Sequence, residues 1–193
     1  MSDQFHLTLG QMNPTVGDLK GNAALAVKVW TVGRDADADM VALPEMFLTG
    51  YNAQDLVRKP AFTKAAMQTA QTLAETCADG PALAIGCPWV ENGKTYNAYL
   101  ICSGGQIISR VLKHHLPNDN VFDEERVFEP GPLAGPYNVG GVRIGSPICE
   151  DAWHEDVPET LEETGAEFLL VPNGSPYARG KFDVRVNHMV ARV

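Results

Sequence analysis

Short apolar runs of strand length alternate along this chain with segments of helical period, and this alternation limits the fold more than any other feature. Phe5–Met12 alternates apolar and polar residues as a strand does, and Asp39–Glu45 is a short run typical of a buried strand. Between them, Leu25, Val29 and Val32 recur at helical spacing and predict one apolar helix face. Strands that alternate with helices predict an α/β fold in which helices cover a sheet.

The rest of the chain continues this pattern without a repeat or a linker. Asp18 is a good cap for the first helix, and Pro60–Ala78 is alanine-rich with proline at its start. Turn residues at Asn92-Gly93 and Gly104-Gly105 predict a meander, and His114–Gly131 has no clear period and is expected to be a loop. The remaining predicted elements are strands at 82–90, 95–102, 106–113, 142–149 and 167–173, with helices at 157–166 and from 182 onward.

Composition and charge exclude several classes of function. The 193 residues suit one domain, expected to span 1–193, and the net charge of −9 with no dense Lys/Arg run disfavours nucleic acid and membrane surfaces as partners. No apolar run is long enough for a bilayer, and the first residues do not resemble a secretory signal. A cytoplasmic location is therefore expected. The cysteines, which form no CxxC pair, are then expected to be free thiols: Cys77, Cys87, Cys102 and Cys149.

The last predicted helix still has its period at Val193, with no capping residue, glycine or proline to end it. We therefore expect the domain to be incomplete at this C-terminal end. An unpaired sheet edge and an uncovered part of the core would then remain.

Three reactive side chains stand at predicted strand ends, where α/β folds collect their chemistry. Glu45, Lys113 and Cys149 supply a carboxylate, an ammonium and a thiol. Each alone is most simply a solvated strand end or a small buried residue. Together they suffice for acyl transfer, with the carboxylate as base, the thiolate as nucleophile and the ammonium facing the developing oxyanion.

The immediate neighbours of Cys149 raise a question, because a reactive thiolate prefers positive surroundings. Glu150 and Asp151 follow it directly. They do not look like activators of the thiol, and we expect them to hold the turn or to meet the amino end of a substrate. The positive charge that Cys149 requires is expected to come from Lys113, more than thirty residues upstream in a different strand.

Four segments in this order carry a family resemblance: ALPEMFLTGY, LKHHLPNDNVFDEERVFEPG, SPICEDAW and PNGSPY. From residue 7 onward the chain resembles the nitrilase, or carbon–nitrogen hydrolase, superfamily, and more narrowly the N-terminal glutaminase domains of glutamine-dependent NAD⁺ synthetases. The resemblance implies a nitrilase-like α-β-β-α sandwich.

The resemblance also assigns roles to residues. It implies Glu45 as general base, Lys113 as the lysine that stabilises the oxyanion, Cys149 as nucleophile and Glu124 as a further glutamate beside the lysine. The side chains expected around the substrate are Ser175 and Lys181 on glutamine, Tyr51 at the pocket wall, Glu150 at the amino end, and Asp119. Asp119 stands where the family usually has tyrosine, and it either meets the substrate ammonium or weakens glutamine binding.

For the protein as a whole, the resemblance implies that L-glutamine is hydrolysed through a cysteine thioester. The ammonia would pass to a synthetase domain that amidates deamido-NAD⁺ with ATP and Mg²⁺. That domain is absent from these residues, since Ser103-Gly-Gly105 lies in a predicted hairpin and is followed by Gln106. No cofactor is expected for the glutaminase domain, and a homo-oligomer is expected.

Other functions remain compatible with the sequence. A free-standing amidase acting on another small amide fits the same residues, and so does an inactive module used for binding or oligomerisation. A Cys–His hydrolase with His154 as base is disfavoured, because His154 points away from the face of Cys149. No metal site is expected: Cys149 and His154 lack ligand spacing, and His114 and His115 in an extended strand end would point to opposite faces.

Overall fold

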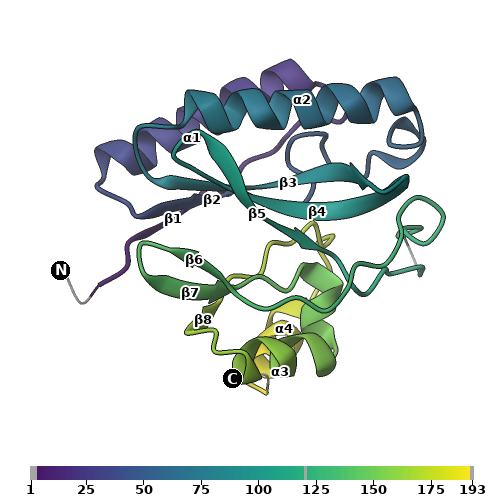
Figure 1. Ribbon diagram of the computed structural model, residues 1–193. Coiled ribbons are helices and arrows are strands. Elements are labelled where there is room, and N and C mark those ends of the chain that lie inside the picture. The colour runs from purple at the N-terminus through teal and green to yellow at the C-terminus, as the bar shows by residue number, and fades with distance from the viewer. Residues whose placement is uncertain (1–3, 120, 192–193) are drawn as a thin grey trace.

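The computed structural model describes residues 4–119 and 121–191 and arranges them in four layers (Figure 1). Helices α1 (Leu19–Asp35) and α2 (Pro60–Thr76) lie over a five-stranded sheet, and a three-stranded sheet packs beneath it. Helices α3 (Asp156–Glu163) and α4 (Lys181–Val190) form the fourth layer. The predicted α-β-β-α sandwich is therefore confirmed.

The larger sheet has the order β1-β2-β3-β4-β5. Strands β1 (Leu7–Leu9), β2 (Met40–Ala42) and β3 (Ala82–Glu91) run parallel, while β4 (Lys94–Ser103) and β5 (Gln106–Leu112) complete the predicted antiparallel meander. Both turns are where the sequence placed them, because their residues adopt the positive φ angles that glycine and asparagine tolerate.

The smaller sheet differs more from expectation. Its strands are β6 (Tyr137–Val139), β7 (Val142–Gly145) and β8 (Phe168–Leu169). Strand β6 was not predicted, although Gly140-Gly141 makes its hairpin with β7. The strands predicted over 142–149 and 167–173 are both too long. After β8 the chain leaves the sheet and runs past the end of β7, where the backbone N–H of Cys149 donates to Pro172 O at 2.9 Å.

Two apolar cores hold the layers together. The first lies between the helices and the larger sheet, and it buries Trp30, whose ring nitrogen donates to Pro81 O at 2.8 Å. The buried stripe of α1 contains Val29 as predicted, but Val32 is exposed, and the stripe continues through the close helix–strand contact at Gly33. Asp18 caps this helix through the N–H of Gly21, which confirms that prediction.

The second core fills the space between the two sheets and contains Tyr99, Ile144, Ile148 and Cys149. The thiol thus belongs to the layer where the sheets meet. Helix α4 ends at Val190, and the expectation about Val193 falls outside the described residues. Within the described chain, no helix combines the length and apolar character needed to cross a bilayer.

Candidate active site

A buried group of charged side chains lies at one end of the larger sheet. Lys113 Nζ is 2.7 Å from Glu45 Oε1 and 2.8 Å from Glu124 Oε2, and none of the three residues is more than 2% exposed. The side-chain amide of Asn97 donates to Glu45 Oε1 at 2.8 Å and to Glu124 Oε1 at 2.9 Å. The structure therefore brings Glu45, Lys113 and Glu124 together around Asn97, a polar residue on β4.

The segment that carries Glu45 is held against β3 by the absence of a side chain at Gly86. A Cβ there would lie 2.0 Å from the backbone N of Met46 and 2.6 Å from the carbonyl carbon of Glu45. The N–H of Gly86 donates to Pro44 O, and the N–H of Leu48 donates to Gly86 O. Glycine is thus required at this close approach, and it fixes the direction from which Glu45 enters the cluster.

The sequence suggested that Cys149 ends a strand, but strand β7 ends at Gly145. Cys149 instead begins the 3₁₀ turn η2 (Cys149–Trp153), with φ of 48°, in the left-handed region that costs a non-glycine residue free energy. Its Sγ lies 3.4 Å from Ser175 Oγ. Such a sharp turn after a strand presents a nucleophile clear of the sheet.

Residues 173–175 connect the thiol to the carboxylate of Glu45. The N–H of Gly174 donates to Glu45 Oε2 at 2.8 Å and also lies close enough to the thiol to lower its pKa. A Cβ on Gly174 would come within 2.5 Å of the ring of Tyr51 and 3.1 Å of Glu45 Oε2. Ser175, Glu45 and Cys149 therefore meet across one tight loop.

The electrostatics of the cluster keep the free thiol protonated. Burial, followed by the negative charge of Glu45, raises the pKa of Cys149 to about 12, while Lys113 and Ser175 act in the opposite direction. Burial opposes charge on Lys113, yet its two glutamate partners outweigh this and raise its pKa. Burial also raises the pKa of Glu124. A thiol in this setting requires a base before it can attack.

Tyr51 and Glu124 are linked, since the Tyr51 hydroxyl donates to Glu124 Oε1 at 3.0 Å. Burial and the two nearby glutamates raise the pKa of this phenol, so it remains a hydrogen-bond donor. Lys181 begins α4, and its Nζ lies 5.7 Å from the centre of the Trp153 ring on η2. Tyr51 is thus part of the cluster, whereas Lys181 lies over the Trp153 ring.

The two acids after Cys149 have different surroundings. The Asp151 carboxylate is buried and accepts three backbone N–H groups, from His114 at 3.0 Å, His115 at 2.7 Å and Ile148 at 3.0 Å. It therefore holds the turn, as expected, and ties it to the segment after Lys113. Glu150 pairs with His154 at 3.5 Å and lines a different cavity, together with Asp119.

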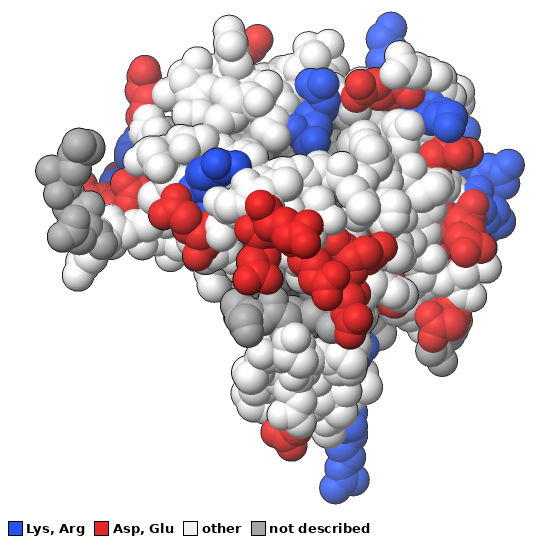
Figure 2. Space-filling view, turned by 60° about the horizontal axis from the view of Figure 1, so that its bottom comes forward, with Lys and Arg blue, Asp and Glu red and all other residues white. Residues whose placement is uncertain are grey.

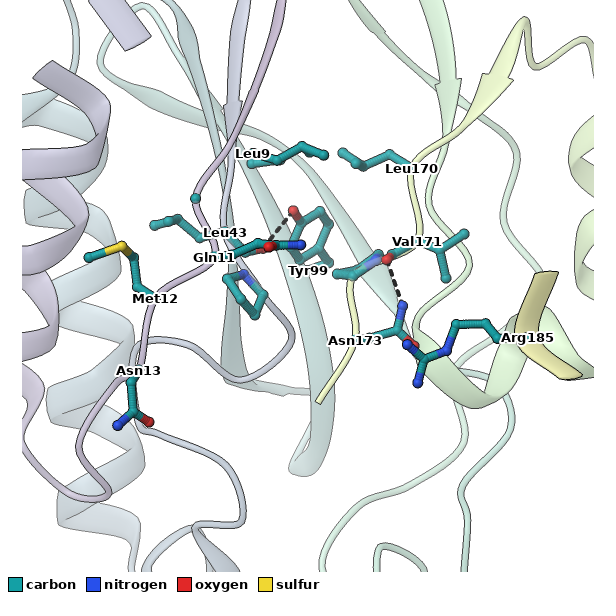
Figure 3. Close-up of a pocket in the computed structure, with 14 residues that line it drawn as sticks. Leu9, Gln11, Met12, Asn13, Leu43, Tyr99, Leu170, Val171, Asn173 and Arg185 are labelled. Carbon is teal, nitrogen blue, oxygen red and sulfur yellow. Dashed lines mark hydrogen bonds between the residues drawn. The ribbon is translucent and has the colours of Figure 1, made fainter. Parts of the chain in front are cut away.

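One cavity opens beside the thiol, and a second shares part of its wall. The first, of about 350 Å³, is lined by Cys149, Trp153 and the strand β8. The other, of about 560 Å³, lies between β1 and the segment after β8 (Figure 3). Leu9 and Leu170 face each other across it, and the guanidinium of Arg185 reaches it from α4 (Figure 3). Spaces of this size suit small molecules.

The sequence did not predict that Asn97 belongs to the cluster, or how His114 and His115 lie relative to each other. Asn97 lies in a predicted strand as a polar residue among apolar ones, which was the available signal. The argument that His114 and His115 point to opposite faces is wrong: their rings meet edge to face with centres 4.7 Å apart. The backbone leaves the extended conformation at this point because both amides turn inward to Asp151.

A four-layer sandwich with a thiol, a lysine and two glutamates in one buried cluster has the groups of a thiol-dependent acyl-transfer enzyme. The chain belongs to the carbon–nitrogen hydrolase family, whose model matches residues 6–190. It is 55% identical over 193 residues to the glutamine-dependent NAD(+) synthetase of Rhodobacter capsulatus, and 32% identical over 190 residues to that of Thermotoga maritima.

Solved structures agree with this assignment. The glutamine-dependent NAD⁺ synthetase of Acinetobacter baumannii matches with a TM-score of 0.88 and 31% identity over 94% of this chain. An amidase from Nesterenkonia sp. matches with a TM-score of 0.82 at 20% identity, which supports the fold alone. The chain covers 35% of the Rhodobacter capsulatus protein, 33% of the Thermotoga maritima protein and 34% of the Acinetobacter baumannii chain, about a third of each.

Proposed function

We propose that this chain is the glutaminase domain of a glutamine-dependent NAD⁺ synthetase. The observation that carries the proposal is the buried contact of Lys113 with Glu45 and Glu124, next to Cys149. The similarity to synthetases supports L-glutamine as substrate. In the whole protein, a synthetase domain outside these residues would use the ammonia with ATP and Mg²⁺ to amidate deamido-NAD⁺, in a cytoplasmic homo-oligomer.

The first step forms a thioester. Glu45 accepts the proton of the Cys149 thiol, and the thiolate attacks the amide carbon of the glutamine side chain. The carbonyl π electrons move to oxygen and give a tetrahedral oxyanion. An ammonium has three N–H bonds, and Lys113 directs two toward Glu45 and Glu124, so the third is available to this oxyanion.

The tetrahedral intermediate then collapses. Glu45 returns its proton to the departing nitrogen, the carbon–nitrogen bond breaks and ammonia leaves. In the second step Glu45 takes a proton from water, whose oxygen attacks the thioester carbon. The carbon–sulfur bond breaks, the sulfur regains a proton and glutamate is released. The hydrogen bonds from Asn97 and Gly174 hold both oxygens of Glu45 in place throughout.

In the resting protein the Cys149 thiol is protonated, so the proposed mechanism requires Glu45 to accept its proton. With a pKa of about 12, Cys149 carries little thiolate near neutral pH. Proton transfer to Glu45 coincides with attack, when the charge moves from sulfur to the oxyanion and toward Lys113. Glu124 holds the ammonium of Lys113 from the other side, and the Tyr51 hydroxyl in turn holds the Glu124 carboxylate.

The test uses the intact protein and its Cys149→Ala variant. We expect NAD⁺ formation from deamido-NAD⁺ and ATP with either glutamine or free ammonia. The variant should lose the glutamine-dependent reaction and keep the ammonia-dependent one. Glutamine hydrolysis that persists in the variant would contradict the role of Cys149. Amide hydrolysis without any NAD⁺ formation would instead identify a free-standing amidase.

A further inference from the structure

A second group of side chains, outside the thiol cluster, lies where β5 leads into the following loop and meets the start of α3. His115 Nε2 is 2.8 Å from Asp156 Oδ1, and His114 Nε2 is 3.8 Å from Asp156 Oδ2. Donor atoms of the three residues all lie within 4.8 Å of one another. Their side chains are 24–45% exposed, so a solvated ion can reach them.

The spacing is close to that of tetrahedral coordination. A zinc ion bound at about 2.0–2.1 Å to nitrogen and oxygen ligands separates those ligands by about 3.3 Å. Measured to one oxygen, Asp156 Oδ2, the separations are 3.0 Å from His115 Nε2 and 3.8 Å from His114 Nε2, on either side of this value. Small side-chain rotations would therefore bring the three donors to one ion, without movement of the backbone that Asp151 holds.

The hydrogen bond at the second ring nitrogen of His114 also favours metal binding by this residue. His114 Nδ1 lies 2.6 Å from Gly131 O. A carbonyl oxygen only accepts, so Nδ1 carries the proton, and in the neutral ring Nε2 presents its lone pair toward Asp156. Histidine ligands in metal sites commonly donate their second N–H to a backbone carbonyl in this way, which fixes the ring orientation.

The surroundings favour a cation. A cavity of about 620 Å³ opens beside the two histidines, and acidic residues line it: Asp119, Glu125, Glu129 and Glu150. Helix α3 lies at the bottom of Figure 1, and the turned view in Figure 2 brings a band of acidic side chains forward on this face. A local negative potential raises the concentration of cations at the mouth of such a cavity.

We propose that His114 Nε2, His115 Nε2 and one carboxylate oxygen of Asp156 bind a divalent ion of the zinc class, with water from the cavity as fourth ligand. Imidazole nitrogens select zinc, cobalt, nickel and copper over magnesium and calcium. The ion would replace the direct hydrogen bond between His115 Nε2 and Asp156. It would tie the residues after Lys113 to α3, next to the turn of Cys149, and it does not depend on the proposed function.

Cobalt is the probe, because Co²⁺ adopts the same coordination and its visible spectrum reports ligand number and thiolate ligation. We expect the metal-stripped intact protein to bind one Co²⁺ at this site with a tetrahedral spectrum, and Zn²⁺ to displace it. Asp156→Asn and His115→Gln should each weaken binding at least about tenfold. Asparagine can still accept the N–H of Val157, so the first variant keeps the start of α3.

Two controls separate this site from others. Cys149→Ala should bind Co²⁺ as tightly as the original protein, which excludes the catalytic thiol as a ligand. His6→Ala, which removes an exposed histidine on another element, should also bind normally. The proposal is overturned if Asp156→Asn and His115→Gln, folded by circular dichroism, bind as tightly as the original. It is equally overturned if Cys149→Ala abolishes binding or if no saturable binding occurs.

Discussion

Replacement of Glu45 by glutamine should have opposite effects on catalysis and on the reactivity of Cys149. The variant loses the proposed base, so amide hydrolysis should fall by about 10²–10⁴-fold. The same change removes a negative charge that raises the pKa of the thiol, and it releases Lys113 from an ion pair. A larger fraction of thiolate should therefore accompany a slower enzyme.

The magnitude follows from the pKa of Cys149. Its rise from 9.0 to about 12 lowers the thiolate fraction near neutral pH by three factors of ten. Burial is the largest cause and persists in Glu45→Gln. We therefore expect a gain on the order of tenfold in thiolate, equal to about one pKa unit. Below the pKa, alkylation should rise tenfold per pH unit in both proteins, with the curve of the variant at lower pH.

The assay is the rate of iodoacetamide modification of Cys149 in the free protein between pH 7 and 10, followed by mass spectrometry. Glu150→Gln is the matched control: it removes the carboxylate adjacent in sequence, whose side chain pairs with His154 instead. Its alkylation profile should be unchanged. Equal or slower alkylation in Glu45→Gln, with the fold retained, would refute the electrostatic argument.

Three further substitutions, two of them with a matched control, test the supports of the cluster. Asp151→Ala leaves three backbone N–H groups without their acceptor and should lower the free energy of unfolding by about 2–4 kcal/mol in urea titrations; a loss below about 1 kcal/mol would contradict its role in holding the turn. Lys113→Met leaves two buried glutamates without a cation and should cost about 3–5 kcal/mol by the same measurement. Lys94→Met, which removes an exposed pair with Glu129, should cost at most about 1 kcal/mol; equal losses for the two lysines would count against the buried network. Gly174→Ala forces a methyl group against a tyrosine ring and should reduce kcat by up to about 100-fold, whereas Gly135→Ala, with ordinary contacts, should leave it unchanged. Full activity in Gly174→Ala would show that the loop is not tightly packed around Glu45.

Much of the architecture could be predicted locally. The meander, the cap at Asp18 and the long helix from Pro60 depend on neighbouring residues, whose periods and turn preferences are visible in the sequence. The short strands of the smaller sheet were harder to predict from the sequence. β6 and β8 have three and two residues, too few to show a period, and pairing with β7 rather than intrinsic preference defines them.

The sequence by itself determined the reactive inventory: a thiol, a lysine and glutamates in segments that resemble one family. Only the tertiary structure decided how they act on one another. Parallel pairing of β1, β2 and β3 and the close contact at Gly86 place Glu45 beside Lys113. Side-chain direction in a loop depends on backbone angles and on distant hydrogen bonds, which no local pattern encodes. For that reason the sequence did not show that His114 and His115 both lie beside Asp156. It also did not show that the negative charge of Asp151, next to Cys149, serves to hold the turn.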